Sequence, residues 1–150
     1  MNKRLSTPRA MALVIGILML LAFPWKANFS TSEDVKNALR KTLAGNHLRV
    51  VSMRGNFANR PTSWDWQQNL LRTVELGSMV QPGDRIHPSD NLGDLVLEDD
   101  GNTFSILCFE DATDRDGCYV LVYSNGKVRG NARLKIQKRS LDWLTGASGK

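Results

Sequence analysis

The stretch that decides the fold is DLVLEDDGNTFSILCFEDATDRDGCYVLVYSNGKVRGNARLKIQK, residues 94–138. Apolar and polar residues alternate along it in runs of strand length, and turn-forming pairs separate the runs. The pattern predicts strands over 94–98, 103–110, 118–124 and 127–138. Short antiparallel strands joined by tight turns indicate a mainly β domain, built as an antiparallel sandwich or a barrel.

Turn-forming residues mark the connections. Asp100-Gly101 and Asn125-Gly126 are typical two-residue hairpin turns. Residues 111–117 form the loop between the second and third strands. Upstream, Gln81-Pro82-Gly83-Asp84 has Pro and Gly where a type II turn requires them. Gly83, Asp84, Asp100, Gly101, Asn125 and Gly126 are therefore expected to act as structural turn residues.

Residues 64–76 fit two structures. In a helix capped by Ser63, the side chains of Trp66, Leu70, Leu71 and Val74 would form one apolar face. In a strand over 71–76, Thr73 and Glu75 would point outward. A further β-prone run begins near His47 and ends at Gly55.

A short amphipathic helix is predicted over residues 31–44. Val35, Leu39 and Leu43 recur at helical spacing. Ser30 and Glu33 have the spacing of a capping box. Gly45 is well placed to end the helix.

The N-terminal segment has the layout of an export signal. Lys3, Arg4 and Arg9 precede an apolar run that ends at Trp25. The bulky Trp25 argues against a cleavage site after Ala27, so we expect an uncleaved anchor over residues 10–25. A cleaved signal and a buried apolar helix remain alternatives. The basic start holds the N-terminus in the cytoplasm.

These observations divide the chain into four parts. Residues 1–26 form the signal or anchor segment, and residues 27–46 hold the membrane-proximal amphipathic helix. Residues 47–145 form a β-rich extracytoplasmic domain, and 146–150 are a tail. The 124 residues that follow the anchor are enough for one domain with a real core.

Charge argues against a nucleic-acid partner. The net charge is +5, but four of the 20 basic residues flank the apolar run, and the rest of the chain is almost neutral. Within it, 84–116 holds ten acids and two bases, and 127–139 holds six bases and no acid. Either these segments form two charged patches, or neighbouring strands pair opposite charges.

Cys108 and Cys118 lie on consecutive predicted strands, on either side of the 111–117 loop. That arrangement can bring their Cα atoms within reach of a bridge, and an exported domain sits in an oxidising compartment. We therefore predict a Cys108–Cys118 disulfide; the alternative is two buried thiols. The spacing does not suit a metal site.

No residue pattern indicates catalysis, a cofactor or a small-molecule substrate. The sequence therefore predicts a protein that is not an enzyme and binds no metal. Trp64 and Trp66 alternate, so in an extended segment both rings would point the same way. Exposed, they would offer a platform for carbohydrate or peptide; buried, they belong to the core.

One family resemblance covers about residues 48–107. It opens at Val51 and Gly55, continues through the turn at residues 77–86, and closes in the hairpin at residues 95–101. The positions that carry it are Gly77, Val80, Gly83, Asp84, Ile86, Leu95, Leu97, Asp100 and Gly101. This pattern resembles the FecR-type β-rich domain found outside the bacterial inner membrane.

The resemblance implies an extracytoplasmic module whose partners are envelope proteins. The regulators of that family hold a sigma factor with a cytoplasmic domain, and nine residues before the apolar run are too few for one. We therefore expect a single-pass protein of the bacterial inner membrane, with its C-terminal domain in the periplasm or outside the cell. Its function is expected to be binding, as a sensor or accessory subunit that docks on an envelope protein. The alternative is a surface module that binds carbohydrate or peptide through Trp64 and Trp66.

Overall fold

The computed structural model describes residues 29–58 and 64–146, with Trp64 described by its backbone. Six strands form one antiparallel sheet in the order β1-β3-β4-β5-β6-β2. The elements in chain order are α2 (Ser32–Ala44), β1 (Arg49–Gly55), α3 (Trp64–Leu76), β2 (Ser78–Met79), β3 (Pro88–Asp99), β4 (Asn102–Asp111), β5 (Asp114–Gly126), β6 (Gly130–Gln137), the 3-10 turn η1 (Lys138–Leu141) and α4 (Asp142–Thr145).

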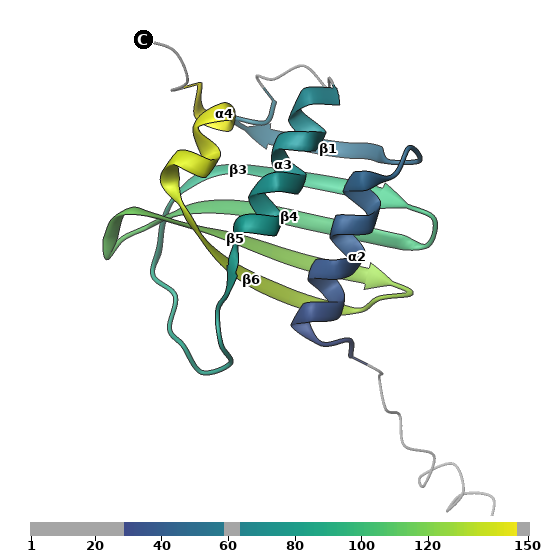
Figure 1. Cartoon of the computed structure of the whole chain (residues 1–150), viewed down its shortest axis with the longest axis horizontal. Coiled ribbons are helices and arrows are strands. Elements are labelled where there is room, and N and C mark those ends of the chain that lie inside the picture. The colour runs from purple at the N-terminus through teal and green to yellow at the C-terminus, as the bar shows by residue number, and fades with distance from the viewer. Residues whose placement is uncertain (1–28, 59–63, 147–150) are drawn as a thin grey trace, which may run out of the picture.

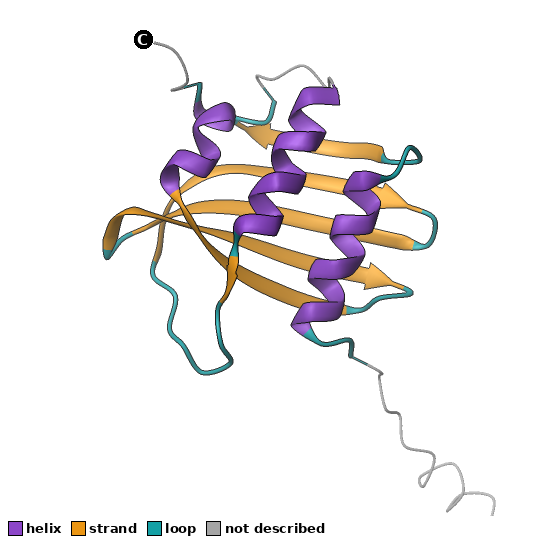
Figure 2. Cartoon of the chain, viewed as in Figure 1, coloured by secondary structure: helices purple, strands orange, loops and turns teal. Residues whose placement is uncertain are grey.

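The predicted mainly β, antiparallel architecture is confirmed, but the sandwich or barrel is wrong. The sheet is open, and α2, α3 and α4 lie over one of its faces (Figure 1). Figure 2 shows this two-layer arrangement, with the helices in front of the strands. Residues 64–76 form a helix, so a layer of helices covers the apolar sheet face that a second sheet would otherwise cover.

The core lies between the sheet and the helices. Strand alternation sends every second side chain of β3 to β6 toward the helices. Val35, Leu39 and Leu43 of α2 and Trp66, Leu70 and Val74 of α3 meet them. The sheet contributes Leu95, Leu97, Phe104, Ile106, Cys108, Cys118, Val120, Val122, Ala132, Leu134 and Ile136. The predicted apolar faces of both helices are therefore the buried ones.

The N-cap of helix α2 is Thr31, one residue later than the predicted cap Ser30. Thr31 Oγ1 accepts a hydrogen bond from the Asp34 N–H at 3.1 Å, and Asp34 Oδ2 accepts one from the Thr31 N–H at 2.9 Å. The capping box is thus Thr31 and Asp34, and the predicted Ser30–Glu33 box is wrong. Ser30 is engaged elsewhere, because its N–H donates to Arg129 O at 2.8 Å.

The β4–β5 connection is tighter than the predicted loop over 111–117. Asp111 pairs with Asp114, so only Ala112 and Thr113 lie between the strands. Strand β5 therefore begins well before Cys118, and the loop that was expected to separate the two cysteines is mostly strand.

The β5–β6 connection is longer than the predicted two-residue turn. Asn125 and Gly126 continue β5 and pair with Thr103 and Asn102 of β4. The connection proper runs over residues 127–129. It is held to the β3–β4 turn, because the Lys127 N–H donates to Gly101 O at 2.9 Å.

The predicted anchor over residues 10–25 lies outside the described residues. Within 29–58 and 64–146, no helix has the length and apolar content that a membrane crossing requires.

Candidate functional site

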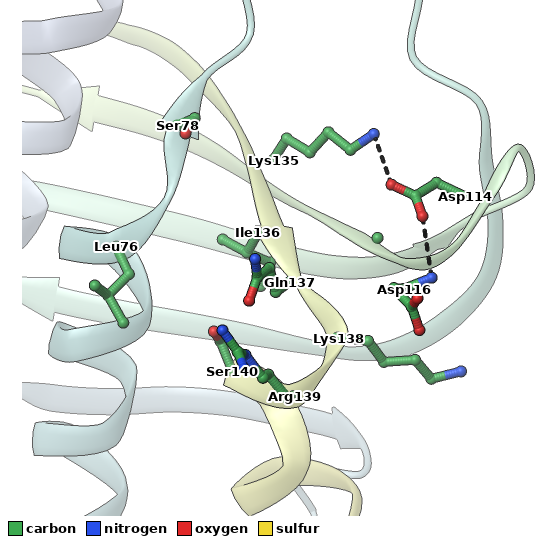
Figure 3. A pocket seen from close by; sticks show the side chains of 11 residues that line it. Leu76, Ser78, Asp114, Asp116, Lys135, Ile136, Gln137, Lys138, Arg139 and Ser140 are labelled. Carbon is green, nitrogen blue, oxygen red and sulfur yellow. Dashed lines mark hydrogen bonds and ion pairs between the residues drawn. The ribbon is translucent and has the colours of Figure 1, made fainter.

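One surface hollow lies at the end of the sheet where β4 turns into β5. Its volume is about 810 Å³. Three segments form its wall: the junction between α3 and β2, the start of β5, and the passage from β6 into η1 (Figure 3). The lining residues are Leu76, Ser78, Asp114, Asp116, Gly117, Lys135, Ile136, Gln137, Lys138, Arg139 and Ser140. We call it the end hollow.

Several charged side chains around the end hollow form ion pairs with one another or with adjacent residues. Lys135 Nζ lies 3.1 Å from carboxylate oxygens of both Asp111 and Asp114. Lys138 Nζ lies 2.6 Å from Glu110 Oε1. These contacts raise the pKa of Lys135 and Lys138. Residues of the acidic and basic segments therefore pair here. Asp114 and Lys135 lie on the neighbouring strands β5 and β6, as one of the two predicted alternatives required, whereas Asp111 and Glu110 belong to β4, on the far side of β5.

Asp111 is the buried centre of this charge network. Its side chain is 0% exposed. It accepts hydrogen bonds from the N–H and hydroxyl of Thr113 at 2.9 and 2.8 Å and from the Tyr119 hydroxyl at 2.9 Å. Burial raises the pKa of Asp111, but bonds from Thr113, Tyr119 and Lys135 outweigh it and hold that pKa well below its usual range. The network fixes the β4–β5 turn to β5 and β6.

Sequence reasoning missed this network. The available signal was the Asp-x-Thr spacing of Asp111 and Thr113, which is typical of a side chain that caps its own turn. The contributions of Tyr119 and Lys135 depend on strand register, which places both on the same face as Asp111.

The second hollow lies on the sheet face that the described helices leave uncovered, which we call the outer face. It has a volume of about 260 Å³ and spans β1, β3 and β4. The lining residues are Ser52, Arg54, Asp94, Leu95, Val96, Ser105, Ile106 and Leu107. We call it the outer hollow. It forms because the small Ser52 and Ser105 flank Val96 in register.

Apolar side chains continue from the outer hollow across the outer face. Leu107 pairs with Leu121 of β5, and Ser105 pairs with Tyr123. Tyr123 is 51% exposed, although it lies in mid-sheet. The outer face therefore carries a partly exposed apolar centre with Arg54 and Asp94 on one rim.

The predicted disulfide is not present: Cys108 and Cys118 are free and buried. Cys108 pairs with Val120, and Cys118 pairs with Glu110, so the two cysteines are diagonal neighbours. Diagonal neighbours lie roughly 7–8 Å apart, beyond the roughly 4.4–6.8 Å between the Cα atoms of a bridge. Burial raises the pKa of Cys108 to about 12 and that of Cys118 to about 11. Both thiols therefore pack as small apolar groups.

The two tryptophans do not share an extended segment. Both belong to α3, where residues two apart point to different sides of the helix. Trp66 is 7% exposed and packs in the core. The side chain of Trp64 lies outside the described part of the chain. A platform made of both Trp64 and Trp66 would require an extended segment, and residues 64–76 form a helix instead.

Four of the six predicted turn residues lie in connections of the sheet, and Asn125 and Gly126 lie in a strand. Gly83 has φ +99°, and the Asp84 N–H donates to Gln81 O at 3.1 Å. Gly101 has φ +94° and follows Asp100 in the two-residue turn between β3 and β4. Asn125 and Gly126 lie at the end of β5, as described above. None of the six touches the end hollow or the outer hollow.

Comparison with known proteins gives no match: no family model, curated protein or solved structure is significantly similar to this chain. The resemblance to the FecR-type domain stays a prediction. The functional argument therefore depends on the two hollows and the surfaces around them.

Proposed function

We propose that this protein is a membrane-tethered binding module outside the cytoplasmic membrane of a bacterium, where it serves as a sensor or accessory subunit. It docks a partner protein on its outer face. The observation that carries this proposal is the outer hollow beside Leu107 and Tyr123, on the sheet face that none of the described helices covers.

The size of the outer hollow favours a protein partner. At about 260 Å³ it is smaller than the roughly 300–1,000 Å³ of small-molecule pockets, and its volume suits one large apolar side chain. Interfaces often depend on one such side chain, inserted into a pocket near the centre and surrounded by polar groups. Arg54 and Asp94 supply polar groups of opposite charge at the rim.

The partner surface has a matching chemistry. It offers an apolar side chain to the outer hollow and a second apolar group to Tyr123. An acidic group of the partner faces Arg54, and a basic group faces Asp94. Such complementarity selects the partner and fixes its orientation.

The end hollow is the weaker candidate. Its volume suits a small molecule, but eight of its eleven lining residues are polar or charged, whereas small-molecule pockets are mostly apolar. Lys135 and Lys138 are already paired there. The carbohydrate platform of Trp64 and Trp66 loses support because Trp66 is a core residue.

Membrane tethering is supported by the sequence. The basic start, the apolar run over 10–25 and the bulky Trp25 favour a retained anchor with the N-terminus in the cytoplasm. Intact mass of the protein extracted from membranes tests this step. Full-length protein that stays in the membrane fraction after a carbonate wash supports the tether. A soluble protein shortened by about 27 residues contradicts it.

Site-specific photo-crosslinking tests the docking surface. A photoreactive phenylalanine replaces Tyr123 in the full chain, and the matched control replaces Leu76, which is 66% exposed at the end of α3. We expect a crosslinked adduct of one defined mass from position 123 and none from position 76. Ser105→Trp fills the outer hollow and should abolish the adduct, while Ser105→Ala should leave it.

Four results would contradict the proposal. Adducts that are equal at positions 76 and 123, or that persist in Ser105→Trp, would show that the outer hollow is not the docking site. An adduct with the mass of two copies of this chain would indicate self-association instead of a separate partner. Absence of any adduct at position 123 in the native membrane would also overturn it.

A further inference from the structure

We propose that one end of the folded domain rests on the phospholipid headgroups, through Phe29, Lys127 and Arg129. We call these three residues the headgroup contact. This inference depends on the proposed membrane tether and deepens it by assigning the surface that faces the bilayer. The occupant is the lipid headgroup layer itself.

The point where the chain enters the domain is fixed. Ser30 donates its N–H to Arg129 O at 2.8 Å, and the Arg129 N–H donates to Ser30 Oγ at 3.3 Å. These two bonds join the start of the described chain to the β5–β6 connection. The chain therefore enters the domain at this corner, as Figure 1 shows for the end of the sheet beside α2 and β6.

The link to the predicted anchor is short. Only Lys26, Ala27 and Asn28 separate Trp25 from Phe29. Four residue steps span at most roughly 14 Å when fully extended. The headgroup layer on each side of a bilayer is roughly 5–8 Å thick. With Trp25 at the interface, Phe29 therefore lies within the headgroup layer or a few ångströms above it.

The side chains at this corner suit that position. Phe29 is 68% exposed, and the guanidinium carbon of Arg129 lies 5.6 Å from the centre of its ring. An aromatic ring suits the interface on either side of a bilayer, and a guanidinium beside it forms charge-assisted hydrogen bonds with lipid phosphates. Lys127 is exposed on the same connection, and its Nζ donates to Asp100 O at 3.0 Å.

Acidic groups limit how strongly this corner attracts anionic lipid. Asp100 is exposed on the adjacent β3–β4 turn. Asp99 accepts a hydrogen bond from Thr42 Oγ1 at 2.9 Å. The headgroup contact therefore depends on tethering and on the Phe29–Arg129 pair, and not on charge alone.

The orientation of the whole domain follows. The β3–β4 and β5–β6 connections lie at the end of the sheet near the membrane, because antiparallel strands place them together. The β4–β5 turn and the end hollow lie at the opposite end. The outer face then stands upright on the membrane, where it is accessible to a neighbouring envelope protein.

Depth measurements on the full chain in vesicles test this inference. The vesicles contain phosphatidylethanolamine and phosphatidylglycerol in a 3:1 ratio. A spin label is attached to Asn125→Cys, near the β5–β6 connection, or to the control Arg115→Cys, near the β4–β5 turn. Cys108 and Cys118 are fully buried, so the label should react with the introduced cysteine alone.

Collision of the label with oxygen, which dissolves in lipid, is compared with collision with a water-soluble nickel chelate. We expect the label at position 125 to be at least threefold less accessible to the nickel chelate than the label at position 115. Phe29→Ser/Arg129→Ser should reduce this difference by half or more. The control Val51→Ser, at a 50% exposed apolar residue of the sheet edge, should not.

The possible failures are distinguishable. If the chain washes off the vesicles, the tether is wrong and the inference fails with it. If the chain stays bound but both labels are equally accessible to the nickel chelate, the tether stands and the headgroup contact is overturned. An unchanged difference in Phe29→Ser/Arg129→Ser would also overturn the role of those two side chains.

Discussion

Asp111 shows how much one residue contributes when the fold surrounds it with donors. Its carboxylate is buried, and it accepts hydrogen bonds from Thr113, Tyr119 and Lys135. We expect Asp111→Ala to lower the free energy of unfolding by about 2 kcal/mol, because it leaves the buried Tyr119 hydroxyl and the donors of Thr113 without their acceptor. Urea denaturation of the purified protein measures this loss.

The matched control is Asp116→Ala, two residues into β5, where the side chain is exposed. A surface substitution of this kind should change stability by no more than about 0.5 kcal/mol. Equal losses in the two variants would show that the Asp111 network does not stabilise the sheet end.

Asp111 also predicts how stability depends on acid. Its pKa is lowered in the folded state, so the ionised form stabilises the fold above the pKa of the unfolded chain, about 3.9. That contribution is lost as the pH falls below about 4. The unfolding midpoint in urea should therefore drop more steeply from pH 4 to pH 2 in the wild type than in Asp111→Asn. Parallel curves would contradict this assignment.

The two cysteines predict the behaviour at high pH. Their pKa values are raised to about 12 and about 11, against about 8.5 in an unfolded chain. Both states keep the thiols protonated below about pH 8.5. Above it the unfolded state releases protons that the folded state retains, so stability falls as the pH rises.

A thiol reagent and a pH series check this prediction. Ellman's reagent should not react with the folded protein and should titrate two thiols after unfolding. The double variant Cys108→Ala/Cys118→Ala should lose less stability between pH 8.5 and pH 11 than the wild type. Fast reaction in the folded state would contradict the observed burial.

At the scale of the element, close approach explains which glycines the turns need. Gly126 has φ +128°, and a Cβ atom there would lie 2.0 Å from Gly101 O. We expect Gly126→Ala to destabilise the protein by about 3 kcal/mol, because it strains the backbone and pushes two turns apart. The midpoint of thermal unfolding measures the effect.

Gly83 supplies the comparison for Gly126. Its φ is +99°, but nothing lies within 4 Å of an added Cβ atom. Gly83→Ala should therefore cost only the backbone strain, about 1 kcal/mol. If the two substitutions cost the same, the contact between the β3–β4 and β5–β6 connections contributes nothing.

The sequence predicted the type of an element correctly where the residue pattern within that element was sufficient. Alternation in β3 to β6 and helical spacing in α2 both gave the correct element type. The prediction was wrong where a contact with a residue distant in the sequence determines the local structure. Asn125-Gly126 is a typical hairpin turn, yet the carbonyl of Gly101 and the side chain of Asn102 bind the backbone of residues 127 and 128 and keep Gly126 within β5.

At the scale of the whole molecule, the prediction of a sandwich or barrel came from the short strands and tight turns, and a segment left undecided between helix and strand overturns it. Residues 64–76 are a helix, and α2 and α3 together supply the layer that closes the core. Spacing within that segment fits both structures, and only packing against the sheet decides between them. The outer hollow was not predictable for the same reason, because it depends on the register of three strands.

The edge of the sheet also limits how partners bind. Strand β1 is an edge strand, and its pairing with β3 shifts register between Val50 and Ser52. Arg49 pairs with Glu98, and Arg54 is exposed near the other end of β1. A bulge and charged side chains discourage another strand from adding to this edge. Partners are therefore expected on the outer face and not along β1.

The two hydrogen bonds between Ser30 and Arg129 determine how the domain would respond to a pulling force. If the proposed anchor is pulled while the proposed partner holds the outer face, the force enters the domain at Phe29 and reaches these two hydrogen bonds first. The next resistance is α2, which would have to peel away from the sheet one apolar contact at a time, from Val35 to Leu39 to Leu43. Under tension, helix α2 would therefore detach before the antiparallel sheet that forms the outer face unfolds.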